Sequence, residues 1–330
     1  MIQMKVKNVL IRYMAIIVIN IAVVLYLMWN TDIWGSAHVE QKSLNQQGDT
    51  VEVEDFITSE NGQTENYSKA IQQAIDFCVA QKKEKVKLKA NKVYTIKSGF
   101  TVKKGVELEF GTNSVLSVKG NYRVLTVEKD SVIRNGTIHI MDPVFQSEVI
   151  FLKGNDQYDA SNKTRVEDMT IINKSKSNKG TGLSLYAKGK WHNISFVLFE
   201  NISIVGFKTA IQLKTENPGA GTYSWINANR FGNMTIDDCV TGIQIIGSIT
   251  IPNESSGNLF TGLQVQLTER SKQLLIADSS YNKFDGMVWD VQRVTGSGPI
   301  VLFSAKTENN KFDMNVAAKL ISDKGQNNSY

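Results

Sequence analysis

Residues 229–245 read NRFGNMTIDDCVTGIQI, and this stretch decides the fold. Phe231 is followed two residues later by Asn233, and apolar residues then alternate with polar ones. The same pattern recurs along the chain, with its first apolar residue at positions 133, 166, 199, 231, 260, 284 and 312. The spacings are 33, 33, 32, 29, 24 and 28 residues. An imperfect period in this range is typical of stacked-repeat proteins.

Each copy is a short run with period-2 alternation that is bounded by Asn, Asp or Gly, which is typical of a β-strand. No helical pattern separates the copies, and a second strand follows at Thr181–Leu185, Thr209–Leu213 and Thr241–Ile245. The pattern predicts an all-β, right-handed parallel β-helix whose coils stack roughly 4.8 Å apart. The signature of leucine-rich repeats is absent from the sequence. A propeller requires antiparallel strands, which the sequence does not indicate.

The N-terminus has the pattern of an export segment. Residues 1–12 include three basic residues, and residues 13–29 are apolar except for Asn20. A basic flank before an apolar run places the basic end inside the cell. Small residues at 35–37 allow cleavage after Ala37, and a membrane anchor at the cell surface is the alternative to secretion. Residues 1–37 are therefore a signal peptide or anchor, and residues 38–50 are a polar linker.

Residues 51–330 are predicted to be a single domain, with a cap region at 51–99, coils at 100–317 and a polar tail at 318–330. Val51–Phe56 alternates as a strand. A helix is predicted from Tyr67 to about Gln81, with Asn66 as its cap and an apolar face. Such a helix covers the open core of the first coil. The segments 142–146, 173–179, 216–221 and 252–256 are predicted to be projecting loops.

The cap region resembles the N-terminal segment of the pectate-lyase-like β-helix superfamily. The resemblance rests on Asp55-Phe56, a polar loop, NYSKAIQQAI at 66–75 and KVKLKANKVYTI at 85–96. That superfamily includes glycoside-hydrolase-28-related proteins and phage tailspike depolymerases. The resemblance implies the β-helix fold and a role on extracellular polysaccharide. Trimers are common among the tailspike relatives, so the resemblance is also compatible with an oligomer.

Composition and charge limit the classes of partner and cofactor that we expect. The formal net charge of +5 is spread along the sequence, which permits acidic polysaccharide, anionic lipid or nucleic acid as a partner. No basic helix with interleaved aromatic residues is present, so we predict no nucleic-acid partner. The two cysteines lie far apart and the three histidines have no metal-ligand spacing, so no metal site is predicted.

The repeat register places candidate catalytic residues on one outward row. Counting from each anchor, the third and fifth residues point inward, and the fourth and sixth point outward. Asp237, Gln266 and Asp290 then stack on successive coils, with the two Asp residues roughly 9–10 Å apart. That separation suits the two carboxyls of an inverting glycosidase. Asp238 adjoins Asp237, and Asp237-Asp238-Cys239 resembles the D-D-C of polygalacturonases, although no G-H-G or R-x-K follows it.

The alternative chemistry is a lyase that acts on a uronic acid. It requires a base and a cation, for which Arg230, Arg270 and Arg293 are candidates, and Ca²⁺ bound by the three Asp residues is the cofactor that it implies. Trp289 is predicted to lie in the core. The candidate substrate-binding residues are Thr235, Gln264, Gln266, Arg293, Tyr223 and Trp225.

These patterns predict an exported protein that cleaves or binds an extracellular, potentially anionic glycan, as a hydrolase or a lyase. A non-catalytic adhesin or a scaffold in exopolysaccharide or cell-envelope assembly is the alternative. Polysaccharide is the predicted partner, together with the membrane if the N-terminal segment is uncleaved.

Overall fold

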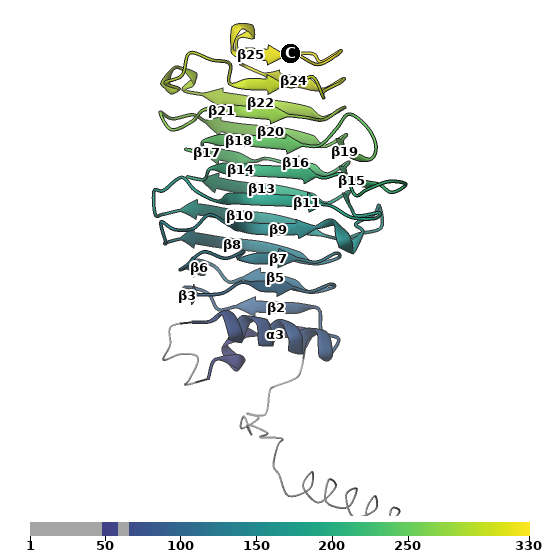
Figure 1. Ribbon diagram of the computed structural model, residues 1–330. Helices are drawn as coiled ribbons and strands as arrows, with labels where there is room; N and C mark the ends of the chain where they lie inside the picture. Colours follow the sequence, from purple (N-terminus) through teal and green to yellow (C-terminus); the bar gives the residue numbers. More distant parts are fainter. Residues whose placement is uncertain (1–47, 59–65) are drawn as a thin grey trace, which may run out of the picture. The chain divides into compact units, whose positions relative to one another are not determined.

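The computed structural model describes residues 48–58 and 66–330, which form a parallel β-helix of the right-handed type (Figure 1). Every strand pairing is parallel, and each strand inside a sheet pairs with strands of the coils above and below. This confirms the all-β solenoid that the repeat predicts. The predicted export segment lies outside the described residues. Among the described residues, no helix is both long enough and apolar enough to cross a membrane.

Three sheets run along the axis of the stack, and we call them sheets A, B and C. Sheet A contains β1 (Thr50–Glu52), β2 (Lys85–Leu88), β3 (Val93–Ile96), β5 (Glu107–Phe110), β6 (Val115–Val118), β8 (Val132–Ile140), β10 (Arg165–Asn173), β13 (Leu198–Val205), β16 (Arg230–Gly232), β17 (Thr235–Asp237), β20 (Leu259–Gln266), β22 (Lys283–Trp289) and β24 (Lys311–Met314). Sheet B contains β4 (Phe100–Val102), β7 (Leu125–Val127), β9 (Glu148–Lys153), β11 (Thr181–Ala187), β14 (Thr209–Thr215), β18 (Thr241–Ile246), β21 (Gln273–Ala277), β23 (Val301–Phe303) and β25 (Ile321–Asp323). Sheet C is short and contains β12 (Asn193–Ser195), β15 (Ser224–Asn227) and β19 (Asn253–Ser256).

The predicted anchor residues form one column inside the stack. Phe199, Phe231, Phe260, Phe284 and Phe312 pair in register along sheet A, and all five are buried. The Phe231 and Phe260 rings are nearly parallel, with centroids 4.3 Å apart. Stacking of identical coils brings like residues together, so the sequence period becomes a continuous aromatic core.

A second column explains the Asn two residues after each anchor. Asn135, Asp168, Asn201 and Asn233 have positive φ angles between 51° and 63°, and Gly262 continues the column. Left-handed backbone is tolerated best by Gly, Asn and Asp. One left-handed residue per coil bends the strand, so the third residue after the anchor points inward again.

An asparagine ladder closes the turn between sheets C and A. Asn229, Asn258, Asn282 and Asn310 are buried, and each donates its side-chain amide to the side-chain oxygen of the next, at 3.0–3.1 Å. Asn328 accepts the last bond at 3.0 Å. The ladder satisfies polar groups that no water reaches.

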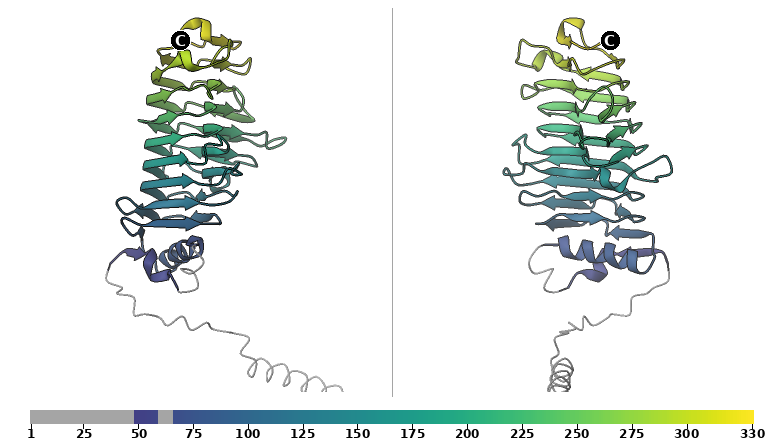
Figure 2. Two further views of the ribbon diagram at one scale, coloured as in Figure 1. Left: turned by 90° about the vertical axis from the view of Figure 1, so that its left-hand side faces the viewer. Right: turned by 45° about the vertical axis from the view of Figure 1, so that its right-hand side comes forward.

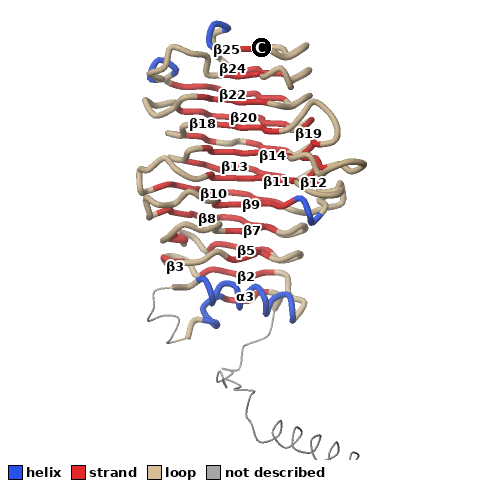
Figure 3. The backbone as a smooth tube through the Cα atoms, in the orientation of Figure 1, coloured by secondary structure: helices blue, strands red, loops and turns tan. Residues whose placement is uncertain are grey.

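The helix α3 (Ser68–Ala80) covers the first coil, as predicted (Figure 2). It buries Ala70, Ile71, Ala74, Ile75 and Cys78 against the core. The prediction of Asn66 as the cap is wrong by one residue, because the N-cap is Tyr67, which makes no side-chain capping bond. Asn66 Oδ1 accepts the Ser68 amide at 3.2 Å just before the helix. Beyond α3, the helical elements are the short 3-10 helices Val53–Phe56, Gly154–Asp156, Val291–Arg293 and Ala318–Leu320 in the part of the chain that the structure describes (Figure 3).

Three segment predictions are wrong in part. The predicted strand Val51–Phe56 is β1 followed by a 3-10 helix, because its second half turns under α3. The predicted loop 252–256 contains β19, since the backbone of β15 offers it a pairing edge. The predicted tail 318–330 contributes β25 to sheet B and bridges Lys311 to Ser329. It therefore continues the stack.

Candidate functional site

Six outward side chains form two rows at the end of the sheet A strands. Thr235 pairs with Gln264 and Gln264 with Met287, while Asp237 pairs with Gln266 and Gln266 with Trp289. We call Thr235, Asp237, Gln264, Gln266, Met287 and Trp289 the Trp289 patch. The structure therefore brings the predicted residues Thr235, Asp237, Gln264 and Gln266 together on one surface.

Trp289 corrects the prediction that it lies in the core. Its side chain is 48% exposed, and its indole Nε1 donates to Gln264 Oε1 at 2.8 Å. The cause is a register shift: two residues stand between Phe260 and Leu263, but only one stands between Phe284 and Gly286, which pairs with Leu263. The coil lacks the left-handed residue, so Val288 turns inward, and its neighbour Trp289 turns outward. In a strand, a slip of one residue reverses the face of every later side chain.

The same shift removes Asp290 from the predicted row, because Trp289 occupies the place beside Gln266. Asp290 begins the 3-10 helix that follows, in a left-handed conformation with φ 56°. Its carboxylate still reaches the patch, since Gln266 Nε2 donates to Asp290 Oδ2 at 2.7 Å. Gln266 thus lies between Asp237 and Asp290, and the pair of Asp residues is not in one row.

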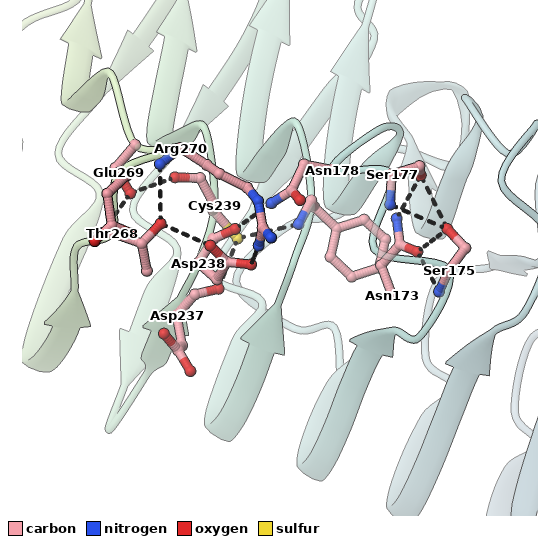
Figure 4. Close-up of polar contacts among 12 residues, drawn as sticks. Asn173, Ser175, Ser177, Asn178, Asp237, Asp238, Cys239, Thr268, Glu269 and Arg270 are labelled. Atoms are coloured by element: carbon pink, nitrogen blue, oxygen red, sulfur yellow. Dashed lines mark hydrogen bonds and ion pairs between the residues drawn. The ribbon is translucent and has the colours of Figure 1, made fainter. Parts of the chain in front are cut away.

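Asp238 is held by a polar network, and its carboxylate points away from that of Asp237 (Figure 4). Thr268 Oγ1 donates to one carboxylate oxygen at 2.6 Å, and Arg270 donates to the other at 2.5 Å. Asn178 donates its side-chain amide to the Asp238 carbonyl. The carboxylate of Asp238 therefore joins its own coil to the coil of Thr268 and Arg270, while the Asp238 backbone carbonyl is bound to Asn178, and the residue has a structural role in this geometry.

Asp237 has a different environment. Figure 4 shows its carboxylate directed away from the Asp238 network. Partial burial raises its pKa above the ordinary value, and the neighbouring Asp238 charge adds to this effect, while the Asp238 amide and Arg293 oppose it. A carboxyl with a raised pKa on an outward strand position suits proton donation.

Arg293 is paired with acidic groups at the edge of the patch. It binds both carboxylate oxygens of Glu269 at 2.8–3.0 Å, and one guanidinium nitrogen lies 3.8 Å from Asp290. Arg230 pairs with Leu198 and Leu259 at the other end of the sheet A strands, and is not near Asp237 in the register. Of the three arginines, Arg293 is thus the one beside Asp290.

Tyr223 and Trp225 lie on a separate flank, at sheet C. Trp191 contacts both, with ring centroids 5.2 Å from Tyr223 and 6.3 Å from Trp225. An open pocket of about 580 Å³ adjoins Tyr223 and is otherwise lined by the loop 217–222 and by Ile251 and Pro252. The predicted substrate-binding residues therefore lie on two surfaces, one at sheet A and one at sheet C.

Metal ligands are not gathered in the described part of the chain. Within residues 48–58 and 66–330, no group of three or more His, Cys, Asp or Glu side chains is placed to hold a metal ion. Asp237, Asp238 and Asp290 thus do not form the Ca²⁺ site that the lyase alternative implies. Cys78 and Cys239 are both free and buried.

No protein-family model matches the chain, and no curated protein does so either. Two solved structures are similar, both double mutants of the tailspike protein of E. coli bacteriophage HK620. The TM-scores are 0.39 and 0.27, at 12% and 11% identity. The alignments cover 85% of this chain in each case, and 65% and 78% of the tailspike chains.

Proposed function

We propose that this protein binds polysaccharide through the Trp289 patch. The observation that carries the proposal is the exposed indole of Trp289, which lies beside the side-chain amides of Gln264 and Gln266. A sugar ring has an apolar face of C–H groups and a rim of hydroxyls. The indole face suits the first, and amide, hydroxyl and carboxylate groups suit the second.

The charge of the patch favours a neutral sugar at this position. Asp237 and Asp290 flank Gln266, while the nearest guanidinium, that of Arg293, is held by Glu269. An acidic sugar placed on Trp289 meets like charge, which costs free energy in a half-buried setting. Binding by the patch requires no turnover, so it is compatible with an exported adhesin or scaffold.

Cleavage is the second candidate, and the raised pKa of Asp237 favours it. In this scheme Asp237 protonates the glycosidic oxygen, and Asp290 activates water on the other side of the bond. The proton leaves Asp237 with the departing sugar, and the proton of the attacking water goes to Asp290. Asp238 is not assigned a catalytic role, because its carboxylate is bound to Thr268 and Arg270.

The test is a panel of neutral and acidic glycans, measured by calorimetry with the full chain. Trp289→Ala is expected to weaken binding of the recognised neutral glycan by about tenfold or more, equivalent to about 1.4 kcal/mol. Tyr281→Ala is the matched control, since Tyr281 is also an exposed aromatic residue but lies outside the patch. Equal affinities for the parent and Trp289→Ala would refute the proposal.

The same panel separates binding from cleavage. If the protein is a hydrolase, reducing ends accumulate with the parent, and Asp237→Asn stops their release while binding persists. A panel with binding but without new reducing ends or unsaturated sugars assigns the protein to the non-catalytic class.

A further inference from the structure

The corner between sheets A and B gathers lysines that the sequence distributes over separate turns. We call this set the basic corner. All of its side chains are exposed, and in the part of the chain that the structure describes none of them forms an ion pair. Its members are Lys119, Lys174, Lys176, Lys179, Lys208 and Lys272. Six lysines from separate turns therefore lie along one edge of the solenoid.

Backbone hydrogen bonds fix the order of the lysines along this edge. Lys208 donates its amide to the Gly180 carbonyl at 3.1 Å, Thr241 to Lys208 at 2.9 Å, and Lys272 to Val240 at 2.9 Å. Lys208 and Lys272 thus stand in one column, two coils apart, which is roughly 9–10 Å. Lys179 precedes Gly180 and lies beside the same column.

A second, parallel column follows the ends of the sheet A strands. Lys119 donates its amide to the Ile96 carbonyl at 3.0 Å, and Met141 donates to Val118 at 3.0 Å. Lys174 follows Asn173, which pairs with Ile140. Lys119, Met141 and Lys174 therefore occupy successive coils, and the two lysines are again two coils apart.

Two acidic groups at this corner are paired with arginines. Asp238 is bound to Arg270, and Glu269 to Arg293. Asp142 accepts the Val144 amide. Asp142 and Asp237 form no ion pair among the described residues, so of these acids the arginines pair with Asp238 and Glu269 alone. The Lys179 ammonium donates to the Pro143 carbonyl at 3.4 Å, and the side chains of the other five lysines of the corner form no hydrogen bond or ion pair within the described structure.

We propose that the basic corner binds a linear acidic polysaccharide that runs along the solenoid axis. The proposal goes beyond the proposed function, since it assigns an acidic polysaccharide to a second set of residues that shares none with the Trp289 patch. Cations that recur along an edge match a polymer with regularly repeated carboxylates. Lysine supplies a point charge for such groups, without the planar fork that arginine offers to phosphate.

The composition of the corner argues against two other anionic partners. Binding of single-stranded nucleic acid uses exposed aromatic platforms, and Phe207, which adjoins Lys208, is buried. Anchoring to a membrane surface uses a broad apolar face with Trp, Phe or Leu. Here Met141 and Val144 are the exposed large apolar side chains near the lysines in the described structure. A narrow charged edge favours an extended chain.

The test compares two triple variants of the full chain that lose equal charge. The corner variant is Lys174→Gln, Lys208→Gln and Lys272→Gln. The control is Lys153→Gln, Lys306→Gln and Lys319→Gln, at exposed lysines that lie off the corner and form no ion pair among the described residues. The probes are polygalacturonate, neutral dextran, double-stranded DNA, and vesicles of phosphatidylglycerol and phosphatidylcholine. Circular dichroism verifies that each variant is folded.

The corner variant is expected to bind polygalacturonate at least tenfold more weakly and with a smaller dependence on salt, because fewer ionic contacts are screened. The control is expected to stay within about threefold of the parent by the same reasoning. Equal loss in both variants, or no binding of polygalacturonate by the parent, overturns the proposal. Corner-dependent binding of DNA or vesicles without polygalacturonate overturns the choice of partner. A failure of the proposed function is detected separately, by comparing the affinities of the parent and of Trp289→Ala for neutral glycans.

Discussion

Asn258 is the residue through which the asparagine ladder is best tested. Its side chain is fully buried, and its Nδ2 donates to the Ile226 carbonyl at 3.1 Å and to Asn282 Oδ1 at 3.0 Å. Its Oδ1 accepts the backbone amide of Asn229 at 3.2 Å and the Asn229 side-chain amide at 3.0 Å. One side chain therefore joins three coils through four hydrogen bonds.

Replacement by Ala removes all four bonds and leaves the buried amide of Asn229 without the acceptor that it has in the native turn. A buried unsatisfied donor costs about 1–3 kcal/mol, and each further bond contributes about 0.5–1.5 kcal/mol. Asn229 Nδ2 retains the Ile194 carbonyl, and Asn282 Oδ1 retains the Asn258 amide, which limits the loss. We expect Asn258→Ala to lower the free energy of unfolding by about 2–5 kcal/mol.

The measurement is urea unfolding followed by far-UV circular dichroism. Asn217→Ala is the control, because Asn217 is exposed and accepts the Gly219 amide within one loop. A surface change of this kind is expected to stay within about 0.5 kcal/mol. If Asn258→Ala costs no more than Asn217→Ala, the ladder does not stabilise the stack and the reasoning is refuted.

The Asn258→Asp variant tests the same contacts through the direction in which its stability changes with pH. The new oxygen faces the Ile226 carbonyl and Asn282 Oδ1, so the folded state disfavours the charged carboxyl and its pKa rises. A folded pKa above the unfolded value means that stability falls as the pH rises from about 4 upward. Stability of Asn258→Asp that increases with pH in this range would contradict the assigned contacts.

Two further predictions concern carboxyl groups and are measured by NMR titration. Asp238→Asn removes the like charge beside Asp237, so the pKa of Asp237 is expected to fall but to stay above its ordinary value, because burial is the larger cause; an unchanged pKa would show that the Asp238 charge does not reach it. Hydrogen bonds from Lys188 and Lys214 hold the pKa of Glu216 at about 2. Its contribution to stability is therefore present above about pH 4.3 and is lost as the pH falls toward the folded pKa. Lys214→Ala is expected to raise the pKa of Glu216, and a value that stays at about 2 would exclude the Lys214 contact as a cause.

The parts of the fold that were predicted correctly are those in which neighbouring coils impose the same residue. Phe231 and Phe260 occupy equivalent places because rings stack at the strand spacing. Asn229 and Asn258 recur because each completes the hydrogen bonds of the other. Such columns leave a periodic trace in the sequence, and the helix α3 leaves an equally direct trace in its apolar face.

The parts of the structure that were not predicted depend on neighbouring strands or on a change in the number of residues in a coil. Residues 253–256 read NESS, which has little strand propensity, and β19 forms because β15 supplies a pairing edge. Trp289 was misplaced because counting from Phe284 assumes a left-handed residue that this coil lacks. The sequence contained one sign of the shorter coil: counting from Phe284 places Val288 at a position that is polar in the preceding coils. The basic corner left no periodic trace, because its lysines come from turns of different length.

The shortened coil also explains why a candidate site lies on a sheet and not on a projecting loop. Between Phe284 and Gly286 one residue fewer is present than between Phe260 and Leu263, and this change turns an indole from the core to the surface. The segment that presents Trp289 pairs with β20, and on its other side the Asn315 side chain hydrogen-bonds to the backbone of Val288, so these bonds hold the patch at fixed spacings. Groups on paired strands are positioned more precisely than groups on loops. A solenoid can therefore create a rigid binding surface by the loss of a single residue from one coil.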